Sequence, residues 1–326
     1  MVRTGVLIRC HNCHTYTGPD WYEWSTDRVT SVVLQMNSRK RCTMRRAVLC
    51  IVIGLIASFV ATEPATAVQE KRDELQSLSG CGPALSKPGG GVWECTFADE
   101  FNGRSLDRTR WVPQTNFATG TSSASSRSCH VDDPRNVALK QGTLQLTIRK
   151  ESTPVMCKGS PANYTSGQVS TYRTFSQQYG RFEARFKNTA TTQPGLQEAF
   201  WLWPDDRTPS GDAGEIDVVE TYSLYYGLAI PFLHYDNLGP IPGVNTAWDC
   251  QAARGVFNTY VLTWTPTTLT IDVNGKTCLV NNSGDPAFQR PYIVAFSQAL
   301  GVGGNALRWN TPIPATMSVD YIRVWR

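Results

Sequence analysis

The stretch EIDVVE, residues 215–220, places three carboxylates within six residues and separates them only by isoleucine and valine. β-Branched residues favour a pleated, half-buried strand, whereas an acidic run that only meets water has no need of them. Successive side chains of a strand point to opposite faces, so Glu215 and Asp217 share one face while Ile216 and Val218 share the other. The stretch therefore predicts a strand with an apolar face and an acidic, functional face.

Strict alternation would send Glu220 to the apolar face. A β-bulge at Val218-Val219 adds the one residue that returns Glu220 to the face of Glu215 and Asp217. Roughly four strand residues then separate Glu215 from Glu220, about 13 Å between Cα atoms, and the two side chains can lean toward each other. We therefore expect a bulged strand with three aligned acids.

Such a carboxylate pair suits the hydrolysis of a glycosidic bond with retention of configuration. One carboxylate attacks while another, about 5–5.5 Å away, protonates the leaving oxygen. Asp217 could hydrogen-bond Glu215 and, by like-charge coupling, keep the pair from ionising equally. The alternatives are a calcium cluster and an exposed acidic strand. Calcium would require more oxygen ligands and a flexible loop, so the acid pair is favoured.

Residues 92–326 show no long stretch with apolar residues at helical spacing. They contain short β-branched or aromatic runs broken by Gly, Pro, Asn and Ser, which predicts an all-β fold. The runs on either side of Asn274-Gly275 predict a hairpin, because this residue pair suits a type I′ turn. The expected strands are 143–148, 167–172, 180–186, 260–264, 269–273, 292–296 and 317–325.

The charge of the chain is unevenly divided. Residues 1–67 hold eight Lys/Arg and four Asp/Glu, so the formal net charge of +4 belongs to this leader. The remaining chain is neutral and contains eight tryptophans. A nucleic-acid-binding protein would present a basic face, so this composition argues against nucleic acid and favours an uncharged partner.

Residues 44–67 have the pattern of a secretory signal peptide: Met44-Arg45-Arg46, an apolar run, and a small-residue cleavage site at residues 65–67. The apolar run of about 15 residues is short for a membrane span, although a single membrane anchor is the alternative. Residues 1–43 form an unexplained extension, which suggests that the true initiator is Met44. Residues 68–91 read as a linker or N-terminal arm, and the domain occupies residues 92–326.

The cysteines support export. The haem-attachment pattern Cys10-His11-Asn12-Cys13-His14 precedes the expected start and lacks a packed core, so we reject a haem site. Six cysteines follow the signal, and an even number in an exported chain predicts disulfides. From the many pairings that six cysteines allow, we predict those between sequence neighbours: Cys81 with Cys95, Cys129 with Cys157, and Cys250 with Cys278.

The chain resembles glycoside hydrolase family 16, in its laminarinase-like (endo-β-1,3-glucanase) branch. EIDVVE looks like the bulged active-site signature of that family, and other segments resemble the family's opening, middle and closing parts in the same order. These segments are FADEFNG at 97–103, Leu106-Asp107 with Trp111, Ser166-Gly167, YGRFEAR at 179–185, AFWL at 199–202 and VDYIRVW at 319–325. The resemblance implies a β-jelly-roll sandwich of two antiparallel sheets, concanavalin A-like, with a glycan cleft on its concave face.

On this resemblance Glu215 matches the nucleophile, Glu220 the acid/base and Asp217 the assisting acid. Trp201 and Trp203 share one face of the preceding strand, where indole rings could stack on sugar rings or pack in the core. Three further residues resemble substrate contacts, each with a structural role as the alternative: Arg185, His234 and Gln298.

The resemblance implies no cofactor for catalysis. It does imply a structural calcium, remote from the acids and held by Asp320 and the backbone at Gly142. The chain departs from the family's pattern at Gln197-Glu198, where the family usually has Trp-Pro.

We therefore expect an exported enzyme, secreted or in the cell envelope, that hydrolyses β-1,3-glucan with retention. Its partner would be the polysaccharide, with no nucleic acid and no stable membrane span after signal cleavage, and the enzyme would be a monomer. The alternatives are the same fold acting on a galactan or a mixed-linked glucan, a transglycosylase, and a non-catalytic carbohydrate-binding protein, because subsites on a shared scaffold decide between them.

Overall fold

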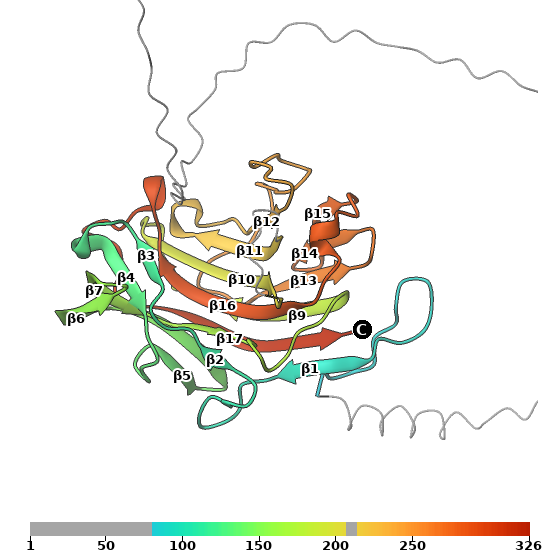
Figure 1. Cartoon of the computed structure of the whole chain (residues 1–326), viewed down its shortest axis with the longest axis horizontal. Helices are drawn as coiled ribbons and strands as arrows, with labels where there is room; N and C mark the ends of the chain where they lie inside the picture. Colours follow the sequence, from blue (N-terminus) through green and yellow to red (C-terminus); the bar gives the residue numbers. More distant parts are fainter. Residues whose placement is uncertain (1–79, 207–213) are drawn as a thin grey trace, which may run out of the picture. The chain divides into compact units, whose positions relative to one another are not determined.

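The computed structural model describes residues 80–206 and 214–326. The regular secondary structure of this part of the chain is almost all β-strand, arranged in two sheets (Figure 1). The predicted all-β class is therefore confirmed. The signal peptide at 44–67, the extension at 1–43 and residues 68–79 of the predicted arm lie outside the described residues.

The smaller sheet has six strands in the order β12-β11-β10-β16-β8-β2. All of its neighbouring pairs are antiparallel. Its strands are β2 (Val112–Pro113), β8 (Gln168–Ser170), β10 (Leu196–Pro204), β11 (Glu215–Tyr222), β12 (Ile230–His234) and β16 (Tyr292–Leu300).

The larger sheet has eleven strands in the described part of the chain, with the main order β15-β14-β13-β9-β17-β6-β7-β4-β3; β1 pairs with β17 and β5 with β6. Its pairs are antiparallel except that β4 and β7 run parallel. Its strands are β1 (Cys95–Asp99), β3 (Ala118–Gly120), β4 (Arg127–His130), β5 (Val137–Lys140), β6 (Thr143–Cys157), β7 (Ser160–Ser166), β9 (Gly180–Lys187), β13 (Asn258–Trp264), β14 (Leu269–Val273), β15 (Lys276–Asn281) and β17 (Ala315–Trp325).

Four short 3₁₀ turns accompany the described strands: η1 (Ala124–Ser126), η2 (Ser223–Tyr225), η3 (Pro286–Phe288) and η4 (Gly303–Asn305). Within residues 80–206 and 214–326, no helix combines the length and the apolar character needed to cross a bilayer.

One hydrophobic core joins the two sheets. Phe182 and Phe186 of β9 alternate with polar residues and contribute to the same buried cluster as Phe200 of β10 and Ile216 of β11. Residues of the same parity on each strand therefore face the core, as expected when one side of each sheet is packed and the other is not. On β10 and β11 the alternate side chains point away from this core and can form a functional face.

Two local sequence predictions are confirmed in detail. The hairpin β14-β15 turns at Asn274 and Gly275, whose φ angles of 52° and 78° are those of a type I′ turn. The predicted strand at 143–148 belongs to β6, which continues to Cys157 because its polar second half pairs with β7.

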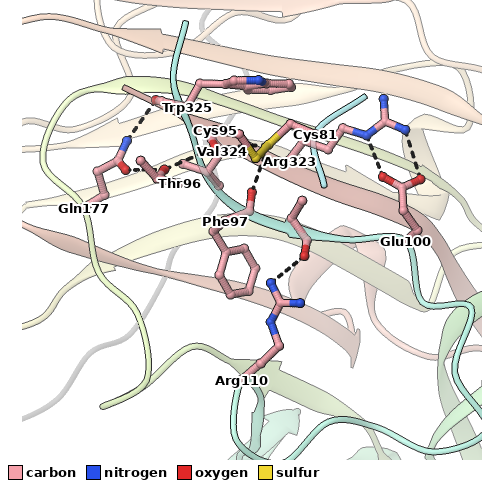
Figure 2. Close-up of a disulfide and its surroundings, with 11 residues drawn as sticks. Cys81, Cys95, Thr96, Phe97, Glu100, Arg110, Gln177, Arg323, Val324 and Trp325 are labelled. Carbon is pink, nitrogen blue, oxygen red and sulfur yellow. Dashed lines mark hydrogen bonds and ion pairs between the residues drawn. A yellow bond between two sulfur atoms is a disulfide. The ribbon is translucent and has the colours of Figure 1, made fainter. Parts of the chain in front are cut away.

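The three predicted disulfides are all present, with Cα–Cα distances of 5.8, 5.6 and 5.5 Å. Figure 2 shows Cys81–Cys95, which ties the described part of the arm to β1, beside the end of β17. In the same region Arg323 donates to Glu100 at 2.6 Å, and Thr96 donates to Gln177 at 2.6 Å. The first and last strands of the domain are thus joined by backbone pairing and polar contacts, and the disulfide ties the arm to the first of them.

Candidate active site

The acids lie on β11, between β10 and β12. On the β10 side, Trp201 is opposite Asp217 and Phe200 is opposite Val219, so Val218 has no partner in the register. The register with β12 shifts at the same place. Val218 and Val219 are both fully buried in the core. The predicted bulge at these two valines is therefore confirmed.

The bulge brings Glu220 to the same face as Glu215 and Asp217. Glu220 is opposite Ala199 on β10, and Glu215 is opposite His234 on β12. Glu215 and Glu220 are half-buried, whereas Asp217 is 5% exposed. The three acids form a row on the unpacked face of the smaller sheet.

His234 joins this row, as the resemblance implied. Its Nε2 lies 3.0 Å from Oδ2 of Asp217, and one ligand atom each from Glu215, Asp217 and His234 lies within 4.8 Å of the others. Asp217 therefore hydrogen-bonds His234. The sequence had suggested a different partner, Glu215. Asp217 is therefore held in place by a residue of β12 as well as by its own strand, β11.

Burial raises the pKa values of all three acids, and repulsion from neighbouring carboxylates adds to the rise for Glu215 and Asp217. Burial is the main cause for Glu215, whose pKa lies well above its usual range; the Asp217 charge raises it further and His234 opposes the rise. Burial and the Glu220 charge likewise raise the pKa of Asp217 well above its usual range. Repulsion between close carboxylates disfavours ionisation of all three at once, which suits a site that needs one protonated and one ionised acid.

Gln197 is a site residue that the sequence reasoning did not identify. Its Nε2 donates to Oε1 of Glu220 at 2.6 Å. Burial raises the pKa of Glu220, and hydrogen bonds from Tyr222 and Gln197 oppose that rise. The available signal was parity, because Gln197 lies four residues before Trp201 and therefore on the same face of β10.

Trp201 and Trp203 lie together on the acid face, next to the row. Their ring centroids are 6.2 Å apart in an edge-to-face arrangement. Trp201 is half-buried opposite Asp217, and Trp203 is 38% exposed. Both rings therefore lie beside the acids on the unpacked face of the smaller sheet.

Gln298 does not lie in the cleft, which corrects the prediction. It shares its parity on β16 with Val294 and Phe296 of the core, and it is fully buried. Its Nε2 donates to Oε1 of Glu198 at 3.2 Å. Arg254 donates to both carboxylate oxygens of Glu198, at 2.9 and 2.7 Å. Glu198 and Gln298 thus form a buried polar cluster beneath the acid face.

Arg185 is also misplaced by the prediction. It alternates with the core residues Phe182, Ala184 and Phe186 on β9 and so points to the outer face of the larger sheet. There its guanidinium pairs with Asp320 and lies 4.4 Å from the ring centroid of Phe257. The surface ion pair, which was the structural alternative, is what the structure shows.

The same ion pair bears on the expected calcium site. Asp320 is the extra residue of a bulge in β17, and its carboxylate pairs with Arg185. The side-chain oxygen of Asn102 lies close to Gly142. Calcium prefers six to eight oxygen ligands, whereas here a guanidinium already balances the carboxylate. Arg185 thus competes with a cation for the Asp320 carboxylate, and the structural calcium stays a prediction.

A two-sheet β-sandwich with this acid row is the scaffold of a class of glycoside hydrolases. The chain belongs to Glycosyl hydrolases family 16, whose family model matches residues 125–322. The resemblance inferred from the sequence is thereby confirmed.

Two relatives show the range of activities near this chain. It is 27% identical over 270 residues to "Glucan endo-1,3-beta-glucosidase A1" of Niallia circulans, covering 72% of this chain but 37% of the relative. It is 26% identical over 303 residues to "Keratan-sulfate endo-1,4-beta-galactosidase" of Sphingobacterium multivorum, covering 87% of this chain and 68% of the relative. The chain thus spans little more than a third of the first relative.

The fold is similar to that of solved laminarinase-type structures. The endo-beta-1,3-glucanase from Pyrococcus furiosus superposes with a TM-score of 0.62 at 21% identity, covering 74% of this chain and 97% of that one. This likeness supports the two-sheet architecture.

Proposed function

We propose that the chain is a retaining endo-glycosidase that hydrolyses β-1,3-glucan, with Glu215 as nucleophile and Glu220 as acid/base. The observation that carries the proposal is the bulged strand β11, which aligns Glu215, Asp217 and Glu220 on one face beside Trp201. The named activity of the Niallia circulans relative supports β-1,3-glucan as the substrate.

In the first step Glu220 donates its proton to the glycosidic oxygen as the bond to the anomeric carbon breaks. The Glu215 carboxylate attacks that carbon and forms a glycosyl ester with inversion. In the second step the Glu220 carboxylate takes a proton from water, which attacks the same carbon and releases Glu215. Two inversions give retention. Asp217 is hydrogen-bonded to His234 and lies beside Glu215. By holding a proton or a negative charge there, it adjusts the ionisation of the nucleophile between the two steps.

Replacement of the nucleophile tests the proposal. Glu215→Gln should reduce the release of reducing ends from laminarin by at least about a thousandfold, because a group that forms a covalent bond is lost. The matched control is Glu183→Gln, since Glu183 pairs with Arg181 on the outer face of the larger sheet. Proton NMR of the first product should show the β anomer. Full activity of Glu215→Gln, or an inverted first product, would refute the assignment.

A second candidate is a galactan, favoured by one observation. The alignment with the keratan-sulfate galactosidase covers 87% of this chain, against 72% for the glucosidase. Gln197, in place of the tryptophan usual in the family, offers a polar group where a flat ring would favour one sugar geometry. Rates on laminarin, mixed-linked glucan and galactan distinguish the two, and oligosaccharides longer than the starting material would indicate transglycosylation.

We also propose that the domain works outside the cytoplasm. Its three disulfides support this location, because such bonds persist in oxidising compartments. Mass spectrometry of the mature protein, purified from its culture medium or cell envelope, tests it: the mass should match cleavage after residue 67, and an intact leader would contradict it.

A further inference from the structure

A series of aromatic rings leads away from Glu220. The Tyr222 side chain hydrogen-bonds Glu220. The rings of Tyr222 and Tyr225 have centroids 6.4 Å apart, and those of Tyr225 and Trp248 have centroids 5.5 Å apart, both edge-to-face. Tyr225 is 40% exposed and Trp248 is 38% exposed. The acid row is thus continuous with an exposed aromatic surface on the other side from Trp201.

The backbone explains how Trp248 reaches this position. The segment 245–252 runs beside β12: Leu233 N donates to Asn245 O at 2.8 Å, and Ala229 N donates to Cys250 O at 2.9 Å. Two isolated bridges, Leu228–Gln251 and Phe232–Thr246, also join this segment to the chain at and just before β12. Trp248 lies in the bend between these bridges, beyond β12.

A cavity with polar residues in its lining lies next to the loop that carries Trp248. Asp249 and Gln251 flank Cys250, and both are exposed. Together with Asn274 and Lys276 of the β14-β15 hairpin they line a cavity of about 270 Å³. The disulfide Cys250–Cys278 holds this loop to the hairpin. An aromatic face with donors and acceptors at its edge is the combination that sugar rings require, because a pyranose has an apolar C–H face and a polar rim.

We propose that Tyr225 and Trp248 form a second sugar-binding surface, which receives the substrate chain after it has crossed the acids from Trp201 and Trp203. The order of strands supports a single path, because Trp201 lies on β10, the acids on β11, and Trp248 beyond β12. The occupant is the polysaccharide itself. The inference rests on the proposed function and adds that a substrate must be long enough to reach Trp248 in order to use this surface.

Tyr225 and Trp248 are both exposed, so the protein does not wholly cover their rings. Exposed aromatic side chains that adjoin a site are candidates for a binding surface. A surface used only for packing would bury these rings against the protein. The same geometry predicts that short substrates, which end before β12, do not use Trp248.

The test compares Trp248→Ala and Tyr225→Ala with a matched control, Trp93→Ala. Trp93 is a half-buried tryptophan just before β1, and its ring centroid lies 5.1 Å from Lys87 Nζ. The measurement is the ratio of kcat/KM on a β-1,3-glucan hexamer to that on a trimer. Each site variant should raise KM for the hexamer by about fivefold, the loss of one ring's stacking, and lower the ratio accordingly.

An unchanged ratio in both site variants, or an equal fall in Trp93→Ala, overturns the inference. If the wild type hydrolyses no glycan, the proposed function fails, and this surface is then judged by retardation in gels that contain laminarin. Retardation that Trp248→Ala loses would still support the surface. Equal retardation of wild type and variant, or none for the wild type, would overturn it, as would binding of a protein partner at this surface in place of glucan.

Discussion

Removal of the Arg254 guanidinium should destabilise the fold far more than removal of a surface arginine. The side chains of Arg254 and Glu198 are 5% and 0% exposed, and two hydrogen bonds of 2.9 and 2.7 Å join them. Arg254→Met leaves the Glu198 carboxylate buried with two neutral donors, the Thr221 hydroxyl at 2.8 Å and the Gln298 amide at 3.2 Å. Breaking a buried pair costs about 3–5 kcal/mol, and with two donors retained we expect about 3 kcal/mol.

The double variant separates the charge from the contacts. Glu198→Leu combined with Arg254→Met removes both charges, so it should cost about 1–2 kcal/mol, the price of the polar groups left unpaired, and less than Arg254→Met alone. Urea unfolding, followed by tryptophan fluorescence, measures each free energy of unfolding. The control is Arg108→Met, since the pair Arg108–Asp132 has side chains 56% and 41% exposed and should contribute less than about 1 kcal/mol.

Two results would refute this reasoning. One is an Arg254→Met variant no less stable than Arg108→Met, which would mean that water reaches Glu198. The other is a double variant whose loss of unfolding free energy equals the sum of the losses in Glu198→Leu and Arg254→Met measured singly, which would mean that the two charges do not interact.

Three further outcomes are expected. Gln197→Ala removes a donor to Glu220 and so raises the pKa of that acid; the alkaline limb of kcat/KM should move to higher pH, and an unmoved limb would show that Gln197 does not act through Glu220. Burial lowers the pKa of His130 to about 4 in the folded protein. As the pH falls below the ordinary histidine pKa, this side chain is therefore protonated in the unfolded chain before it is protonated in the folded one. The wild type should therefore lose up to about 3 kcal/mol between pH 6.5 and 4; thermal unfolding of His130→Gln should show a shallower loss, and parallel curves would contradict it. Cys250→Ser with Cys278→Ser opens a loop of sequence separation 28 and should cost about 3.5 kcal/mol on the chain-entropy relation, measured by urea unfolding.

Local patterns in the sequence were enough for several features of the fold and the site. The extra valine in EIDVVE demanded a bulge, because only an added residue keeps Glu220 with Asp217. The pair Asn274-Gly275 demanded a tight hairpin, because both residues tolerate a positive φ. These features depend on neighbours in the chain, and the structure confirms them.

Features that depend on long-range register were beyond the sequence. Alternation on β9 shows that Arg185 is opposite the apolar face, but two sheets each have an outer face, and alternation does not say which one lies over the acids. The contact of Gln197 with Glu220 needs the register of β10 against β11. Gln298 is the exception, because its parity with Phe296 already placed it on the core side.

The bulge has a genetic consequence. Loss of Val218 by a three-base deletion would leave the order Glu-Ile-Asp-Val-Glu, and plain alternation in that order also sets three acids on one face. The row of acids is thus insensitive to this change of length. Asp217 and Glu220 already span only two residues of β10, from Trp201 to Ala199, so the deletion keeps this span and removes the bend and extra twist of the bulge.

The deletion would instead change the packing of the hydrophobic core. Val218 and Val219 both fill the core, so the deletion removes one whole side chain from a close-packed layer. Gain or loss of this codon would therefore alter the local twist of the strand under the acids, provided that the opposite sheet repacks to fill the space. In this strand, insertion and deletion are a way to adjust geometry without losing the acids.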